Sequence, residues 1–434
     1  MHGDRRQDRG LSGAGLFAFC PRAAADRKQV LCRRAAVLQI QGRMAERHPA
    51  PAGRIKHWIH ITEKTMIFEP VGLGFNKKDF TKDEEIALNK QFTKLLHSVH
   101  TEIKGETCFY CGKRVSSFCE SHFVPKFCLN NISINGRVSG YNAILGLPSM
   151  GTSIGKEAPG IGEAGTFRII CRDCDSTIFR DYENPENYSA EKQPSQKILA
   201  EIAMKDYLKF VYKRMFELEM SRQARSLCDD NSLFGHYAKR KIEIEEPVKA
   251  LDLKAYTSCF MRAKKHCEKG SSGYYVVYYR ILDYVAPVAA QSPVTLSIDI
   301  EGGVVYNIYN QDPSFNPTDI HVCVFPLKDK TVVLLFIDDG DKHYRRFYKQ
   351  LRKLSAEDQL GVINYIIFLY CEDYFLAKEI SSIVDVSQLK EVAETTPVIV
   401  SSTPIDNALQ ISAQYSLANW KRIPNLLSEA YKIR

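Results

Sequence analysis

The sequence predicts an α+β protein with three folded parts: a small zinc module, a helical connector and a C-terminal antiparallel sheet with packed helices. Two Cys-x-x-Cys pairs indicate the zinc module. Segments with apolar residues at helical spacing follow the second pair. Runs of β-branched and aromatic residues, separated by turns, then indicate the sheet.

Composition favours a globular protein of a reducing compartment. The chain has 434 residues, 44% of them hydrophobic, which is enough for two or three domain cores. Thirteen cysteines in a chain of this length are not a small disulfide scaffold, and those outside the two pairs show no pairing rhythm. We therefore expect a cytoplasmic location. No apolar run approaches the ~18 residues that span a bilayer, so we expect no membrane partner.

The net charge of +8 is unevenly distributed along the chain. Residues 1–65 contain 13 Lys and Arg against 5 Asp and Glu, whereas the rest of the chain contains 46 of each sign. These first 65 residues are rich in Arg, Ala, Gly and Pro, so we expect a disordered basic tail. The abrupt change after them leads to the hypothesis that Met66 opens the native protein. Because the remainder is neutral, any nucleic-acid surface must come from local clustering of charge.

Residues 66–190 are assigned to the zinc module and a preceding helix. A capping box at residues 81–84 and apolar residues at helical spacing predict that helix from Phe80 to about Ile103. In each cysteine pair, a two-residue spacer lets both thiolates face one ion. Gly112-Lys113, directly after the first pair, predicts a turn typical of a zinc knuckle. Four unrelated thiols or redox-active pairs are the alternatives, but a redox motif does not explain why the pair occurs twice. We expect a structural Zn²⁺ bound by Cys108, Cys111, Cys171 and Cys174.

A polar segment separates the two pairs. Residues 130–165 contain eight glycines, which predicts a long flexible loop. Within it, Gly151–Lys156 partly matches a nucleophile elbow, but the flanking strand and helix patterns are missing. The same segment partly matches a phosphate loop, but it is one residue short between its glycines and lacks Ser or Thr after Lys156. Cys119 and Cys128 have spacings that fit no pair, so we expect ordinary core or surface thiols.

Residues 191–270 are predicted to form a helical connector. The segment 194–220 carries a wide apolar stripe interleaved with Lys and Arg. We expect the stripe to pack in the core, and the basic face either to be solvated or to line a DNA groove. A second helix is expected from Pro247 to about Cys267.

Residues 271–434 are predicted to form an α+β domain of unknown role. Strands are expected at 273–283, 294–300, 304–309, 321–325 and 331–337, in an antiparallel meander. Helices are expected at 344–354, 356–377 and 419–433. Between strand and helix stand Asp338, Asp339, Asp341 and His343. A second metal site and helix capping both account for this cluster, and capping is the simpler cause.

The segment between the cysteine pairs carries a further motif. It reads Glu120-Ser121-His122-Phe123-Val124-Pro125, and Asp175 directly follows the last cysteine. This layout resembles the HNH, or ββα-metal, endonuclease superfamily in its zinc-bearing four-cysteine branch. The resemblance covers about residues 105–190 and implies a treble-clef-like ββα module.

The resemblance also implies roles for individual residues. The four cysteines hold a structural zinc, and His122 acts as the general base on a water molecule. Asp175 helps to hold a catalytic Mg²⁺ or Mn²⁺, in a position where the family usually has Asn or His. Ser121 stands where the family usually has the other, acidic cation ligand. A neutral hydroxyl is a poorer ligand for a hard cation, although Asp175 restores one negative charge.

Phosphodiester hydrolysis needs what this set of residues offers. An imidazole with a pKa near ~6.5 can deprotonate water, and a cation neutralises charge on the scissile phosphate. We therefore expect a hydrolase, an HNH-like metal-dependent endonuclease that acts on nucleic acid, with DNA as the expected substrate. The resemblance implies a role in restriction or phage defence. The alternative is a catalytically inactive zinc-binding module that binds nucleic acid or another protein.

Overall fold

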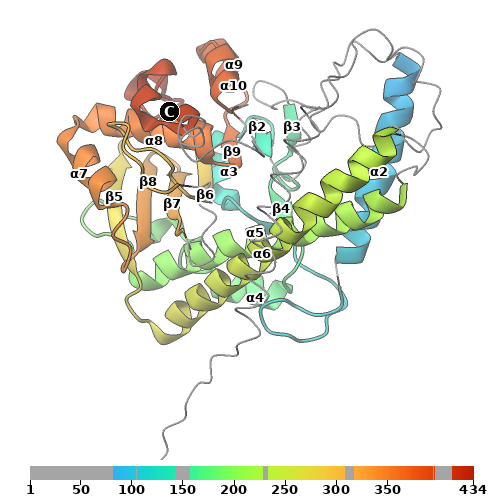
Figure 1. The fold of residues 1–434 in the computed structure, drawn as a ribbon. Helices are drawn as coiled ribbons and strands as arrows, with labels where there is room; N and C mark the ends of the chain where they lie inside the picture. The colour runs from blue at the N-terminus through green and yellow to red at the C-terminus, as the bar shows by residue number, and fades with distance from the viewer. Residues whose placement is uncertain are drawn as a thin grey trace, which may run out of the picture.

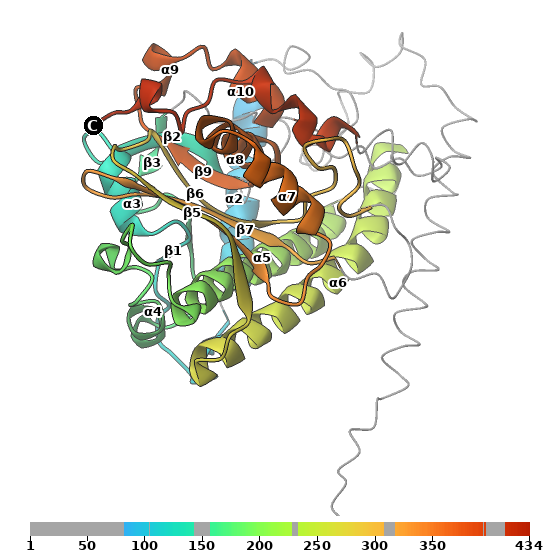
Figure 2. The ribbon, with the colours of Figure 1, turned by 90° about the vertical axis from the view of Figure 1, so that its left-hand side faces the viewer.

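The computed structural model describes residues 82–103, 105–142, 157–227, 233–307, 317–393, 395 and 413–434. The predicted basic tail, Met66 and the Gly151–Lys156 segment lie outside these ranges. The described chain is a mixed α/β structure in which an antiparallel sheet has helices on both faces (Figures 1 and 2). No helix in the described ranges is both long and apolar enough to cross a membrane.

The main sheet has seven strands within the described residues, all paired antiparallel. Their spatial order is β3-β2-β9-β6-β7-β8-β5, so β3 and β5 form the edges. The strands are β2 (Arg137–Asn142), β3 (Glu157–Gly160), β5 (Tyr274–Leu282), β6 (Val288–Val294), β7 (Ile320–Pro326), β8 (Thr331–Asp338) and β9 (Asp373–Leu376).

Both faces of the sheet are covered, which explains why its central strands are apolar throughout. Successive side chains of a strand point to opposite faces, so Cys323 and Phe325 of β7 enter one core while Val322 and Val324 enter the other. Every residue of β6 and β7 is buried. The first core lies against α5 (Gln196–Leu227) and α6 (Leu233–Lys269), the second against α7 (Arg345–Lys353) and α8 (Ala356–Tyr370).

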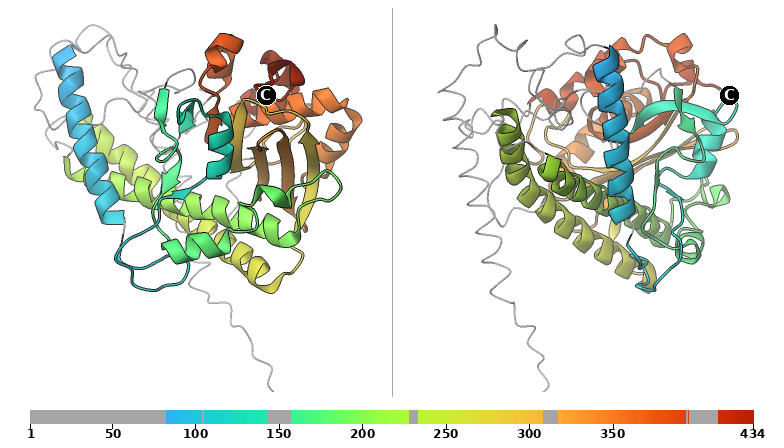
Figure 3. Two further views of the ribbon diagram at one scale, coloured as in Figure 1. Left: turned by 180° about the vertical axis from the view of Figure 1, so that it is seen from behind. Right: turned by 90° about the vertical axis from the view of Figure 1, so that its right-hand side faces the viewer.

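The long helices expected from apolar spacing are present. The first is α2 (Lys82–Ile103), which packs beside α5, as Figure 3 shows, with His100 Nδ1 2.8 Å from the Tyr212 hydroxyl. Pro247 was expected to precede a helix, but it lies inside α6. A proline removes one backbone hydrogen bond, and packing of α6 along α5 outweighs that local preference.

Several C-terminal boundaries differ from the expectation. The predicted strand 294–300 is wrong, because β6 ends at Val294 and the chain then turns at Asp299, whose carboxylate accepts hydrogen bonds from two backbone N–H groups. The expected helix 356–377 ends at Tyr370, and the chain continues as β9. The expected helix 419–433 is replaced by short 3₁₀ turns at Leu417–Arg422 and Glu429–Tyr431.

The glycine-rich segment 130–165 was expected to be a loop, yet its described part contributes β2 and β3 to the main sheet. Residues 139–142 of β2 pair with β9 in a regular antiparallel register. Main-chain hydrogen bonds need no side chains, so a segment without an apolar pattern can still join a sheet edge. The range that carries the cysteine pairs and the C-terminal range therefore share one sheet.

The basic face of α5 is buried rather than solvated or open to DNA. Lys209 and Asp373 form a fully buried ion pair, and Lys213 pairs with Glu372. On the same helix, Asp206 lies 2.6 Å from His321 Nδ1 of β7. The charged residues of α5 are therefore partners for charged residues of the sheet, and they fix how the helix sits on it.

We predict that Lys209→Met lowers the free energy of unfolding by about 3–5 kcal/mol, because Asp373 would stay buried without its counter-charge. Urea titration followed by circular dichroism measures the change. Lys328→Met, at an exposed lysine, is the control and should change stability by less than ~0.5 kcal/mol. Equal stability of the two variants would contradict a structural role for the buried pair.

Candidate functional site

The four predicted cysteines meet at one point. One sulfur atom from each of Cys108, Cys111, Cys171 and Cys174 lies within 4.8 Å of the others. The first pair sits on a tight turn, in which Gly112 N–H donates to the Cys108 carbonyl at 2.8 Å. Gly112 has φ +69°, a left-handed conformation that favours glycine. The predicted turn after the first pair is therefore confirmed.

The second pair sits at the beginning of α4 (Arg172–Ile178). Cys171 directly precedes the helix and Cys174 lies in its first turn. The backbone N–H of Cys171 donates to Cys108 Sγ at 3.3 Å, so a hydrogen bond already joins the two pairs. Four convergent sulfur atoms are a donor set that suits a tetrahedral metal ion such as Zn²⁺. The four cysteines can therefore bind one metal ion, and Cys119 and Cys128 are not part of this group.

Helix α6 supports the first cysteine turn from outside. The Phe109 ring meets Phe260 edge to face at 5.3 Å between centroids. Lys264 Nζ donates to the Tyr110 carbonyl at 2.9 Å and lies 3.9 Å from the centre of the Tyr110 ring. The turn that carries two of the cysteines is thus held against a long helix of the connector.

A small two-stranded sheet carries the histidine motif. Strand β1 (Ser121–His122) pairs antiparallel with β4 (Thr166–Phe167). Ser121 is buried, and its hydroxyl donates to Asp175 Oδ1 at 2.5 Å. The two positions for which the resemblance implied a shared cation are therefore in direct contact. Glu120 points elsewhere, to an exposed ion pair with Arg168.

The Asp175 carboxylate is surrounded by donors from the protein. Besides Ser121, it accepts from Lys205 Nζ at 3.0 Å and from Cys119 Sγ at 3.4 Å. Burial alone would raise the pKa of Asp175, but the Lys205 charge and these hydrogen bonds outweigh it and hold the pKa below its usual value. The carboxylate is thus a stable anion with its partners already in place.

Lys205 is the central cation of this site. Its side chain comes from α5, is fully buried, and also lies 3.2 Å from Glu183 Oε1. The ammonium lies 3.9 Å from the centre of the Phe179 ring, close enough for a cation–π interaction. Lys205 therefore links α4, the segment after it, and α5.

Sequence reasoning missed both Lys205 and Glu183. A signal for Lys205 was present, because it falls on the apolar stripe of α5, seven residues after Ile198 and seven before Tyr212. A lysine at a core position of a helix indicates a buried acidic partner. The sequence around Glu183 gave no comparable signal.

The arrangement does not fit a catalytic Mg²⁺ or Mn²⁺ at Asp175. Such ions require several oxygen ligands, and the position next to this carboxylate is held by an ammonium group, a hydroxyl and a thiol. Within the described ranges, the four cysteines are the one group of three or more side chains arranged to hold a metal ion. The expected pairing of Ser121 with Asp175 therefore exists as a hydrogen bond and not as a pair of cation ligands.

His122 is held separately from Asp175. Its ring Nε2 lies 2.8 Å from the Ile161 carbonyl and donates to it, which leaves Nδ1 without a proton in the neutral ring. Burial lowers the pKa of His122, so the ring is neutral at pH 7. The ring is therefore oriented as a general base would be. Asp175 accepts its hydrogen bonds from other side chains, among them Ser121 and Lys205.

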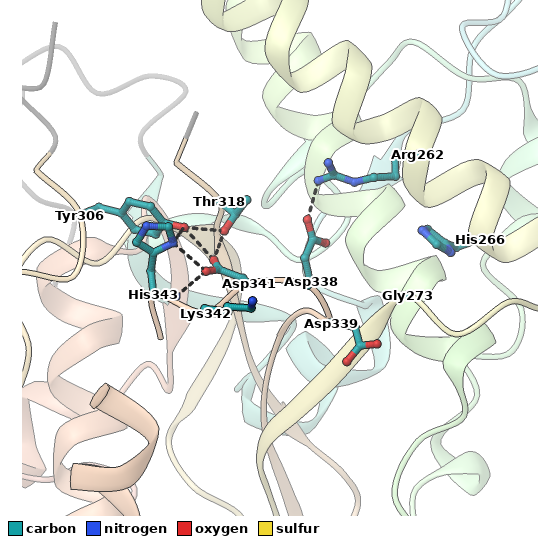
Figure 4. A pocket seen from close by; sticks show the side chains of 11 residues that line it. Arg262, His266, Gly273, Tyr306, Thr318, Asp338, Asp339, Asp341, Lys342 and His343 are labelled. Carbon is teal, nitrogen blue, oxygen red and sulfur yellow. Dashed lines mark hydrogen bonds and ion pairs between the residues drawn. The ribbon is translucent and has the colours of Figure 1, made fainter. Parts of the chain in front are cut away.

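In the acidic cluster before α7, Asp338 and Asp341 have partners in the protein, and Asp339 is exposed. Asp341 accepts from the Tyr306 hydroxyl at 2.8 Å and from the His343 backbone N–H at 2.7 Å. Asp338 pairs with Arg262 at 2.7 Å, as Figure 4 shows. The cluster lines a cavity of about 660 Å³. The capping interpretation is wrong, because α7 has Tyr344 at its N-cap, without a side-chain capping hydrogen bond, and no acidic residue in its first turn.

Comparisons of the chain with protein-family models, with curated proteins and with solved structures found no match.

We predict that the purified protein contains about one zinc ion per chain and that Cys171→Ser loses it. Loss of the ion should unfold the module, because a structural zinc supplies folding free energy directly. Metal analysis and near-ultraviolet circular dichroism measure the two effects. Cys259→Ser is the control, since Cys259 lies outside the cluster. An unchanged zinc content in Cys171→Ser would refute the four-cysteine site.

Proposed function

We propose that residues 105–190 form a zinc-stiffened, non-hydrolytic interaction module on an HNH-like frame, and that its partner is nucleic acid. The frame is supported by the pairing of β1 with β4 and by α4, which follows β4 beside the cysteine cluster; α3, β2 and β3 are inserted between β1 and β4. The lack of hydrolysis rests on one observation: the buried ammonium of Lys205 lies against Asp175, where the family would place a catalytic cation.

An ammonium in this position cannot replace the catalytic ion. A divalent cation neutralises charge on the scissile phosphate by direct contact with its oxygen atoms. Lys205 is fully buried, and its nitrogen is already shared by Asp175 and Glu183, so a phosphate cannot reach it. In this proposal the ion pair keeps the frame folded, and the zinc module serves as a rigid base for binding.

A metal-dependent endonuclease is the second candidate function. It is favoured by His122, whose ring is fixed by the Ile161 carbonyl and is neutral, as a general base must be. In that case Nδ1 would accept a proton from water, and Mg²⁺ or Mn²⁺ would have to displace Lys205 from Asp175. The second requirement makes this candidate weaker than the first.

Nucleic acid as the partner follows from the resemblance and from exposed arginines near the site. Arg172 begins α4, Arg180 follows it, and both side chains are exposed. Neither forms an ion pair with the parts of the chain that the structure describes. Guanidinium groups without internal partners are free to contact phosphates.

We predict that wild-type protein with Mg²⁺ or Mn²⁺ does not nick plasmid DNA, and that His122→Ala is equally inert. Gel electrophoresis with several DNA and RNA substrates makes the comparison, with zinc content as the check on folding. Nicking by the wild type that His122→Ala abolishes, with zinc retained, would establish the endonuclease and overturn the non-hydrolytic proposal.

Lys205→Met should lower the free energy of unfolding by about 3–5 kcal/mol, because Asp175 and Glu183 would lose their shared counter-charge. Lys205→Met combined with Asp175→Asn should recover part of that loss, since one of the two carboxylates is removed as well. Urea titration of wild type, Lys205→Met, Asp175→Asn and the double variant measures the coupling. Strictly additive effects would contradict the ion pair.

A further inference from the structure

Helix α7 presents a strongly basic surface on the outside of the molecule (Figures 1 and 2). At about 100° per residue, its charged side chains lie on one side of the helix, and Phe347, Gln350 and Leu351 lie on the buried side. Phe347 and Leu351 are buried in the core of the C-terminal region. We define the α7 basic face by its exposed residues Lys342, Arg345, Lys349, Arg352 and Lys353.

Most charges of this face are not neutralised by the protein. Arg346, next to the face, pairs with Asp299 at 3.0 Å and with Glu301 at 3.7 Å. By contrast, no residue of the α7 basic face has an ion-pair partner in the described ranges. Asp339 is exposed and lines the same cavity as Lys342, and Glu301 lines the hollow beside the face. The described part of the chain thus concentrates uncompensated positive charge on one helix.

The face borders a hollow of about 400 Å³. Lys342, Arg345, Lys349 and Lys353 line it, and Glu301 is its acidic residue. Along the helix axis, residues 345–353 extend about 12 Å at 1.5 Å per residue. This length is enough to contact two or more successive phosphates of one strand.

Aromatic rings continue the surface on its other side. Tyr348 lies on α7, with the Arg352 guanidinium 5.5 Å from its ring centre. Tyr275, on the edge strand β5, meets the Tyr348 ring edge to face at 5.7 Å, and 42% of it is exposed. Basic groups beside exposed rings are the combination that binds single strands, in which phosphates meet cations and bases stack on aromatic side chains.

We propose that the α7 basic face, with Tyr275 and Tyr348, binds a single strand of nucleic acid. This inference rests on the nucleic-acid partner of the proposed function and adds a second contact surface to Arg172 and Arg180 of the zinc module. An anionic membrane is the less suitable partner, because interfacial helices insert apolar side chains, and those of α7 are buried in the protein.

The test is binding of a fluorescein-labelled oligothymidylate of about 20 nucleotides to the full zinc-loaded chain, measured by fluorescence anisotropy over a range of salt concentrations. Lys349→Ala combined with Lys353→Ala should weaken binding about tenfold at low salt. The plot of log K against log salt has a negative slope, and this slope should become shallower by about 1.4. Each phosphate contact with a single strand contributes about 0.7 to the slope, and the double variant loses two contacts.

The matched control removes two positive charges from the opposite end of β8. Lys328 and Lys330 are exposed and flank the turn between β7 and β8, whereas α7 follows the other end of β8. Lys328→Ala combined with Lys330→Ala should bind within twofold of wild type. Zinc content and circular dichroism must match wild type in both double variants.

A second pair of variants tests the aromatic part of the surface. Tyr275→Ala should weaken binding about fivefold or more, whereas Tyr275→Phe should bind like wild type because the ring is retained. If Tyr275 had only a structural role, both variants would change the melting temperature. The folded variants would then bind the oligonucleotide as tightly as wild type.

Three results would overturn the inference. If the α7 double variant binds like wild type, the strand is held elsewhere, and the nucleic-acid partner of the proposed function survives. If wild type binds phosphatidylserine vesicles but no oligonucleotide, the membrane is the partner instead. If wild type binds neither, both the surface and the nucleic-acid partner are refuted, and the nicking assay still decides separately whether the module hydrolyses DNA.

Discussion

The buried ammonium of Lys205 is the constraint on which the site depends. Removing such a charge from water costs several kcal/mol, and the cost is offset only when close partners surround it. Here these partners are Asp175, Glu183 and the Phe179 ring. All three come from α4 and the segment after it, while Lys205 comes from α5. One interaction therefore decides both where α4 sits and what the Asp175 carboxylate can bind.

The same helix ties the cysteine cluster to the sheet. Lys209, one turn after Lys205, pairs with Asp373 of β9, and Asp206, directly after Lys205, pairs with His321 of β7. Because each pair is buried, a shift of α5 along its axis would leave several charges without partners at once. Strands β2 and β3 add a second link, since they leave the cysteine region and join β9. The cysteine cluster and the sheet are thus connected both through α5 and through β2 and β3.

The features that the sequence predicts well are those with a local spacing. The two cysteine pairs, the turn at Gly112 and the long helices α2 and α5 all carry short-range patterns, and they are present. The contact between Ser121 and Asp175 was implied by resemblance to a family motif. The long-range pairing of β2 and β6 with β9 was not predictable. Strand β9 has too few residues to show a strand pattern in the sequence. Strand β2 pairs through main-chain hydrogen bonds, which do not require an apolar side-chain pattern. Lys205 carried a signal, but its acidic partners lie too far along the chain to be matched to it.

A crystal structure of the zinc-loaded protein soaked in Mn²⁺ tests the central claim most directly, because anomalous scattering locates both metals. We expect zinc among the four cysteines, no manganese at Asp175, and the Lys205 ammonium within hydrogen-bonding distance of that carboxylate. Manganese bound to Asp175, with Lys205 displaced and His122 facing the ion, would contradict this claim.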